Sequence, residues 1–262
     1  MTTITQGQKF YFAAVGLLAL WVGIWGYFIP SRVDQAIPWL VPPLHARFLG
    51  AMYLSGATFM VGALLSHHYA EVRTTVFGIA VWTGMLFVVS LFYLNEFDYS
   101  RAQVWIWFGA YVVYPLIALW LFWQHRNRNE RIEGLEVPGW ARGYLLIQGI
   151  ALTTLAVLLL LGFMVGVWPW KISGLLAQLY SAPFLSYGLM SLMLCRQQTW
   201  LELRTAVFGI FVFAFGVLIA SFLHRSLFAF WSLSTVLWFA GFSLATVMLG
   251  LLAAKSVRGD SA

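Results

Sequence analysis

Charged side chains are scarce in this sequence. Asp, Glu, Lys and Arg make up 9% of its 262 residues, whereas 61% of the residues are hydrophobic. A soluble domain needs more polar side chains than this to face water, so the composition excludes a soluble enzyme. The net charge of +6 is spread over short segments and forms no single basic face, so we expect no nucleic-acid partner.

Cysteines and metal-binding patterns are also nearly absent. Cys195 is the single cysteine, which excludes an internal disulfide, a thiolate metal cluster and a redox pair. The five histidines show no His-x-x-x-His, Glu-x-x-His or His-Glu-x-x-His spacing, so we assign no metal site, no cofactor and no catalytic residue. His45 and His224 are the one pair that could meet on the face opposite the termini, and haem ligation by these two rings is left open.

Long uncharged runs fill most of the chain. When every Asp, Glu, Lys, Arg and His is taken as a break, eight runs of 19 residues or more remain: 10–31, 48–66, 74–95, 102–124, 143–170, 172–195, 205–223 and 226–254. About 20 helical residues span the hydrocarbon core of a bilayer, because a helix rises about 1.5 Å per residue. We predict an all-α integral membrane protein with eight transmembrane helices.

The polar groups inside these runs are all neutral. A charge within a span costs about 2.5–3.5 kcal/mol on insertion scales, and where one persists it usually marks an ion or proton path. The sequence therefore disfavours a proton pump, a voltage sensor and an ion-coupled transporter with a carboxylate at the centre of the membrane.

The sequence contains an internal repeat. Residues 73–79 (RTTVFGI) match residues 204–210 (RTAVFGI) at six of seven positions, at a separation of 131 residues that we call the repeat offset. The same offset aligns Pro38-Trp39 with Pro169-Trp170. Each unit holds four predicted spans, an even number, so both units enter the membrane in the same sense. We predict two parallel four-helix repeats, 1–124 and 143–262, joined by a charged linker at 125–142.

The distribution of basic residues predicts the orientation. With eight spans both termini lie on one side of the membrane, and that side holds ten of the fifteen Lys and Arg residues. Basic residues stay preferentially on the cytoplasmic side. We therefore expect cytoplasmic termini and a cytoplasmic 125–142 linker.

On the face opposite the termini, the first repeat is ionisable where the second is neutral. His45, Arg47, Glu96, Asp98 and Arg101 align with Leu176, Gln178, Leu227, Ala229 and Ser232. Together with Asp34, these ionisable residues belong to the segments expected to join the first span to the second and the third to the fourth. Such a set could bind the polar head group of a ligand or supply acid–base chemistry. The alternative is that these groups pair with one another in water.

Two further arginines occupy matching positions near the predicted cytoplasmic surface. Glu71-x-Arg73 and Glu202-x-Arg204 lie just before the third and seventh runs. A guanidinium there can hold a lipid phosphate through paired hydrogen bonds, so Arg73 and Arg204 are candidate lipid anchors. The alternative is an intramolecular ion pair at the membrane boundary.

Short motifs mark the first repeat: Phe28-Ile29-Pro30, Pro38-Trp39 and Ala46-Arg47-Phe48-Leu49-Gly50. On these motifs the unit resembles the four-helix units of small bacterial membrane proteins of the DoxX-like kind, here duplicated over almost the whole chain. The second unit departs from the last motif with Ala177-Gln178-Leu179-Tyr180-Ser181. The resemblance implies a helical membrane fold and a bacterial inner-membrane location, and it brings no agreed activity.

Three functions fit these observations. The first is a membrane scaffold or accessory protein that binds lipid or another apolar small molecule between its two halves, with membrane lipids and a membrane protein as candidate partners. The second is a transporter or flippase for a neutral or lipidic solute, which would work by rocking of the halves. The third is a membrane enzyme acting on a lipid or quinone head group at the ionisable cluster.

Overall fold

The computed structural model describes residues 2–126, 132 and 134–258, and long helices dominate them. The helices are α1 (Gln6–Phe28), α2 (Pro43–Leu65), α3 (Tyr69–Phe92), α4 (Ala102–Gln124), α5 (Gly139–Leu160), α6 (Gly174–Leu194), α7 (Trp200–Leu223) and α8 (Leu233–Arg258). All of these except α6 are long and apolar enough to cross a membrane. The prediction of an all-α chain is confirmed, and its architecture is that of a multi-pass membrane protein.

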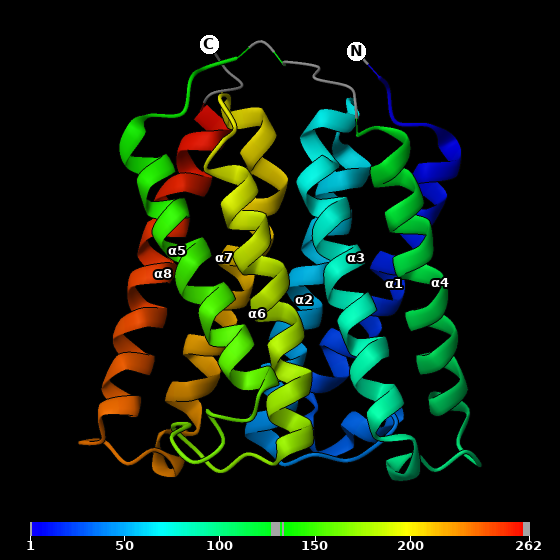
Figure 1. Ribbon diagram of the computed structural model, residues 1–262, viewed down its shortest axis with the longest axis vertical. Helices are drawn as coiled ribbons and strands as arrows, with labels where there is room; N and C mark the ends of the chain where they lie inside the picture. Colours follow the sequence, from blue (N-terminus) through cyan, green and yellow to red (C-terminus); the bar gives the residue numbers. More distant parts are fainter. Residues whose placement is uncertain (1, 127–131, 133, 259–262) are drawn as a thin grey trace.

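The helices lie side by side along one direction (Figure 1). Both chain ends and the α4–α5 connection lie at one end of the bundle, which we call the terminal face. The α1–α2, α3–α4, α5–α6 and α7–α8 connections lie at the other end, the opposite face. Three of them contain short 3-10 helices, η1 (Pro30–Gln35), η2 (Leu94–Glu96) and η3 (Arg225–Leu227).

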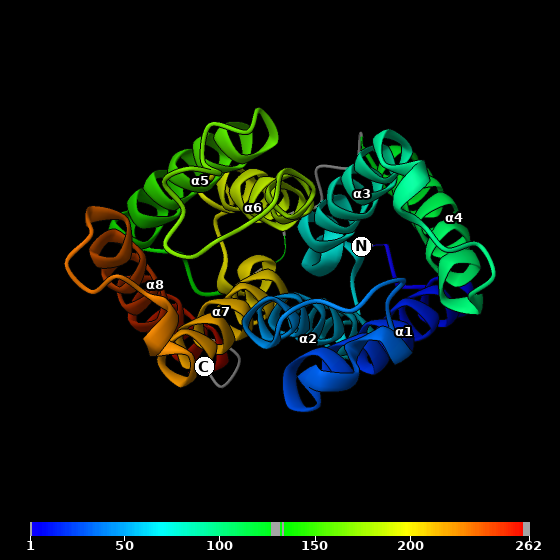
Figure 2. The same ribbon diagram turned by 90° about the horizontal axis from the view of Figure 1, so that it is seen from below.

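Neighbouring helices pair in the same way in each half of the chain. The first half, α1–α4, contains the packed pairs α1–α2 and α3–α4, and the second half, α5–α8, contains α5–α6 and α7–α8. The halves join through α2 against α7, α3 against α6, and α3 against α7 (Figure 2). The central helices are therefore α2, α3, α6 and α7, whereas α1, α4, α5 and α8 are peripheral.

Several buried contacts recur at the repeat offset. The indole N–H of Trp107 donates to Ser90 Oγ at 2.9 Å, and that of Trp238 donates to Ser221 Oγ at the same distance. Between the halves, a Cβ on Gly78 would overlap Met190, and one on Gly209 would overlap Phe59, the residue matching Met190. Small residues at these positions let α3 and α7 approach α6 and α2 closely.

The first helix of each half follows a different offset. Ile4 N donates to His67 O and Val137 N to Gln198 O, so the segments ahead of α1 and α5 each pair with the segment preceding α3 or α7. His67 and Gln198 are separated by the repeat offset, whereas Ile4 and Val137 lie two positions further apart in the sequence. The second half is therefore two residues shorter than the first between this pairing segment and its third helix.

The helices extend into segments that sequence analysis placed outside the spans. Pro43 occupies the first position of α2, where its fixed φ suits a helix start, so His45 and Arg47 lie near the start of this helix and not in a loop. In the same way, Glu71 and Arg73 lie in the first two turns of α3, and α5 starts at Gly139, inside the expected linker. The predicted spans stop at each charged residue, but a helix can continue past one, because a charged group at the helix end stays hydrated. Four of the linker's charged residues lie outside the described residues: Arg128, Glu130, Arg131 and Glu133.

Candidate functional site

The ionisable residues predicted on the opposite face divide into separate pairs. In the first half, Arg101 and Asp34 form an ion pair with Nη2 and Oδ2 3.6 Å apart. Arg101 Nη1 also donates to the carbonyl oxygen of Pro38 at 2.7 Å. This arginine therefore holds the α1–α2 connection against the start of α4.

His45 and Arg47 instead contact the second half. His45 is buried, and its Nδ1 is 2.7 Å from the hydroxyl of Tyr180. Arg47 Nη1 hydrogen-bonds to Nε2 of His224 at the end of α7. Burial, and secondarily the positive charge of Arg47, lower the pKa of His224, so the neutral ring accepts this bond. The two imidazoles therefore engage different residues, His45 with Tyr180 and His224 with Arg47.

The remaining acidic residues of the prediction lie in the α3–α4 connection. Glu96 and Asp98 are exposed, and two hydrogen bonds from Ser100 lower the pKa of the Asp98 carboxyl. Among the residues that the structure describes, no group of three or more His, Cys, Asp or Glu side chains could hold a metal ion. The structure thus brings together Asp34 with Arg101 and Arg47 with His224, and leaves Glu96 apart.

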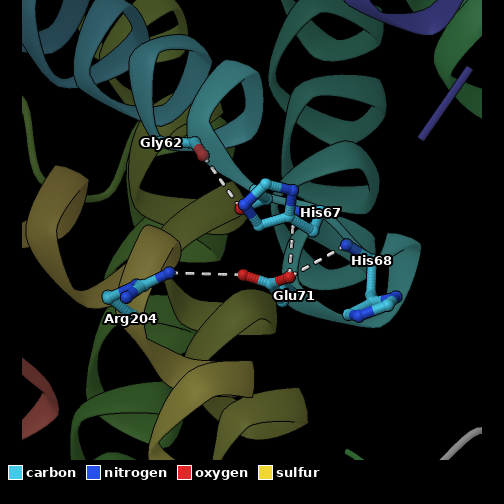
Figure 3. A network of polar contacts seen from close by, with 6 residues as sticks. Gly62, His67, His68, Glu71 and Arg204 are labelled. Atoms are coloured by element: carbon cyan, nitrogen blue, oxygen red, sulfur yellow. Dashed lines mark hydrogen bonds and ion pairs between the residues drawn. The ribbon is translucent and has the colours of Figure 1, made fainter. Parts of the chain in front are cut away.

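The two candidate lipid anchors have different surroundings on the terminal face. Arg204 Nη2 lies 3.3 Å from Glu71 Oε2, which joins the two halves (Figure 3). Glu71 is buried, and its Oε1 accepts from the backbone N–H groups of His67 and His68 at 3.1 and 2.9 Å. By contrast, Arg73 Nη2 donates to the Arg126 carbonyl at 3.1 Å and does not meet Glu202, the counterpart of Glu71.

A small polar cavity separates Arg73 from the second half. It holds about 360 Å³ of empty space, including the part open to the outside, and Arg73, Tyr69, His125 and Glu202 are among the residues that line it. Glu202 Oε2 is occupied by the backbone N–H groups of Gln198 and Thr199, which it caps. Of the two arginines, Arg73 is the one that lines this cavity.

A larger apolar cavity lies inside the first half, among α1, α2, α3 and α4. It encloses about 660 Å³, including the part open to the outside. Apolar side chains of α1 form one wall, and the rest of the lining includes five aromatic side chains from the other three helices: Tyr53, Trp82, Trp107, Tyr111 and Tyr114. Sequence analysis missed this site because each aromatic residue, taken alone, is equally compatible with packing or with an interfacial belt.

Hydrogen-bonding groups line this cavity without any charge. The hydroxyls of Tyr53 and Tyr111 hydrogen-bond to each other, and Thr83 Oγ1 donates to the Ile79 carbonyl at 2.6 Å. Trp82 also lines the cavity, and its buried indole N–H has no acceptor among the residues that the structure describes. No Asp, Glu, Lys, Arg or His belongs to the lining.

The cavity opens between α1 and α4, which lie next to each other in Figure 2. Ile106 of α4 lines the cavity and is 54% exposed, and Leu18 of α1 and Gln103 of α4 are half-buried. Nearer the terminal face, Tyr11 OH donates to the carbonyl of Tyr114 at 2.9 Å and links the same two helices. In a bilayer this opening would face the acyl chains.

The matching positions of the second half carry a different set of side chains. Tyr53, Trp82, Thr83, Tyr111 and Tyr114 are replaced by Phe184, Phe213, Ala214, Phe242 and Ala245. Gly56, which leaves space beside Trp82, is replaced by Tyr187, whose ring lies 4.9 Å from that of Phe213. The polar lining is therefore a property of the first half.

Comparison with protein-family models, with curated proteins and with solved structures found no match.

Proposed function

We propose that this chain is an integral membrane protein that binds a lipid or another apolar molecule in the first-half cavity, as a scaffold or accessory protein. The observation that carries the proposal is an uncharged cavity of about 660 Å³, with hydrogen-bonding groups in its wall and an opening between two peripheral helices. Pockets for small ligands are likewise mostly apolar, with a few hydrogen-bonding groups in the wall. The sequence-based expectation placed the ligand between the two halves, whereas this proposal places it inside the bundle α1–α4.

The packing between the halves supports binding over transport by rocking. Tyr187 OH of α6 donates to Ser55 Oγ of α2 at 3.0 Å, and Ser186 Oγ donates to the carbonyl of Gly78 at 2.8 Å. These buried bonds, together with the glycine contacts of α3 and α7, would have to break if the halves moved against each other. The enzyme alternative has less support, because the ionisable residues of the opposite face form separate pairs.

The proposal includes two parallel four-helix repeats that span the membrane eight times. Two observations support the repeats. The helices pair in the same way in both halves, and the Trp107–Ser90 hydrogen bond recurs as Trp238–Ser221. α6 is not among the helices that length and apolar composition mark as candidate spans, and it is a central helix with many buried residues. Its 21 residues reach about 32 Å, enough to cross the hydrocarbon core.

The orientation and location remain as the sequence predicts them. We expect the terminal face in the cytoplasm and the chain in a bacterial inner membrane, on the excess of basic residues and on the resemblance given above. Arg73, which borders the polar cavity of the terminal face, is the stronger of the two candidates for holding a lipid phosphate, since Arg204 pairs with Glu71.

Native mass spectrometry of protein released gently from its membrane tests the proposed function. We expect a bound molecule at a ratio of one per chain. Ala110→Phe places a ring in the cavity and should abolish this adduct while the protein still folds. The matched control is Gly241→Phe at the equivalent position of the second half, where an added Cβ meets open space; it should keep the adduct.

The same spectra separate the alternatives. An adduct that persists in Ala110→Phe would place the ligand elsewhere and contradict the proposal. A second polypeptide that stays bound would identify the partner of an accessory protein.

A further inference from the structure

The wall of the first-half cavity contains a hydrogen-bond donor without an acceptor. Two tryptophans line the cavity, and the indole N–H of Trp107 donates to Ser90 Oγ. The N–H of Trp82, a residue 5% exposed, has no partner in the described part of the chain. Leaving such a donor unpaired costs free energy that a ligand oxygen would recover.

The tyrosine pair supplies a second donor. When two hydroxyls hydrogen-bond to each other, one of them donates and the other keeps its own hydrogen free. Tyr53 and Tyr111 are both buried and both line the cavity. The residues that line the cavity therefore include an indole N–H and a tyrosine O–H that are not used in hydrogen bonds to the described residues.

The absence of charge in this lining restricts the occupant further. With no Asp, Glu, Lys, Arg or His in the wall, an ionised ligand would lose its hydration without gaining a partner. A neutral ligand avoids this cost. A purely hydrocarbon ligand would leave both donors unpaired.

The second half shows which residues packing alone would accept. At the positions of Trp82, Tyr53 and Tyr111 it has phenylalanine in each case. Phe213, the counterpart of Trp82, is buried and packs well on Tyr187, so helix packing at this position needs no N–H group. Packing alone therefore does not require the donors that the first half carries at these positions.

We infer that the molecule bound in the first-half cavity is neutral and carries a carbonyl-type oxygen, as in a ketone, quinone or ester, which accepts a hydrogen bond from Trp82 Nε1. This inference rests on the proposed function and specifies the chemistry of its ligand. The apolar remainder of the ligand lies along α1 and extends toward the opening between α1 and α4.

A matched pair of probes tests the inference on the whole protein in lipid nanodiscs. Benzophenone carries a carbonyl and crosslinks to nearby side chains on illumination, and diphenylmethane has the same rings without the oxygen. The dependence of labelling on benzophenone concentration gives the affinity for benzophenone. The concentration of diphenylmethane that suppresses this labelling gives the affinity for diphenylmethane. We expect the ketone to bind about threefold to tenfold more tightly, as one net hydrogen bond implies.

Trp82→Phe should remove most of this preference by lowering the affinity for benzophenone and leaving that for diphenylmethane nearly unchanged. The control is Phe213→Trp in the second half, which should keep the preference. If Trp82→Phe folds poorly, the infrared carbonyl stretch of benzophenone bound to the unsubstituted protein answers the question, since a hydrogen bond lowers it below its value in hydrocarbon.

Two failures can be distinguished. Equal binding of both probes in the cavity, a preference unchanged by Trp82→Phe, or a carbonyl stretch as in hydrocarbon would overturn the inference and leave the proposed function standing. If neither probe labels cavity residues, and Ala110→Phe changes nothing, the proposed function fails and the inference fails with it.

Discussion

Removing the Glu71 carboxylate should destabilise the protein more than removing its counterpart Glu202. Both side chains cap a helix by accepting backbone N–H groups from the two residues before it. Only Glu71 also reaches across to the other half, where it meets Arg204. A comparison of Glu71→Ala with Glu202→Ala therefore isolates the contact between the halves.

The magnitudes follow from the surroundings of the two carboxylates. Loss of a helix cap costs about 1 kcal/mol, which is what we expect for Glu202→Ala. Breaking a buried ion pair costs about 3–5 kcal/mol, but the Arg204 side chain is 27% exposed and can regain water. We therefore expect about 2–3 kcal/mol for Glu71→Ala, a lowering of Tm by roughly 4–12 °C, against roughly 2–4 °C for Glu202→Ala.

Thermal unfolding in mild detergent, followed by the fluorescence of the fourteen tryptophans, measures both changes. The double variant Glu71→Ala/Arg204→Ala should lose less than the sum of the single variants, because the second substitution removes a partner already lost. Equal shifts for Glu71→Ala and Glu202→Ala, or additive effects in the double variant, would refute the role of this contact.

Three further predictions concern other parts of the molecule. The pKa of His224 is lowered from its ordinary value of about 6.5, so its stabilising contact with Arg47 is complete above that pH and lost as the pH falls below it. The unsubstituted protein should therefore have a higher Tm than His224→Phe at about pH 8, and this difference in Tm should shrink as the pH falls to about 5. A difference in Tm that does not change with pH would contradict this prediction. Trp107→Phe and Trp238→Phe each remove one indole–serine bond and should cost about 0.5–1.5 kcal/mol in chemical unfolding, to a similar extent if the two halves are repeats. A reporter enzyme active only in the periplasm should be active when fused near Asp98 and silent when fused after residue 262; the reverse pattern would invert the orientation.

Sequence analysis could predict the features of the fold that depend on side-chain identity at a fixed spacing. The repeat offset aligned Ser90 with Ser221 and Trp107 with Trp238, and the structure joins each serine to its tryptophan. It did not detect the longer offset that relates the first helix of each half. There, little beyond Gly16 with Gly149 and Tyr11 with Tyr144 is shared, and biased apolar composition hides so weak a signal.

The candidate site could be predicted much less well. Charge differences between the repeats drew attention to the opposite face, but Arg47 is held by His224 and Arg101 by Asp34, contacts that depend on which helices meet. The cavity depends on aromatic side chains contributed by several helices at once. The substitution of Tyr53 and Tyr111 by phenylalanine in the second repeat was visible in the sequence, although only the cavity gives this difference a meaning.

An experimental structure of the protein in lipid nanodiscs, prepared without stripping its lipids, tests the central claim most directly. The account predicts elongated density inside the bundle α1–α4, with its polar end within hydrogen-bonding distance of Trp82 Nε1. A cavity closed by its own side chains, or ligand density found only between the two halves, would contradict it.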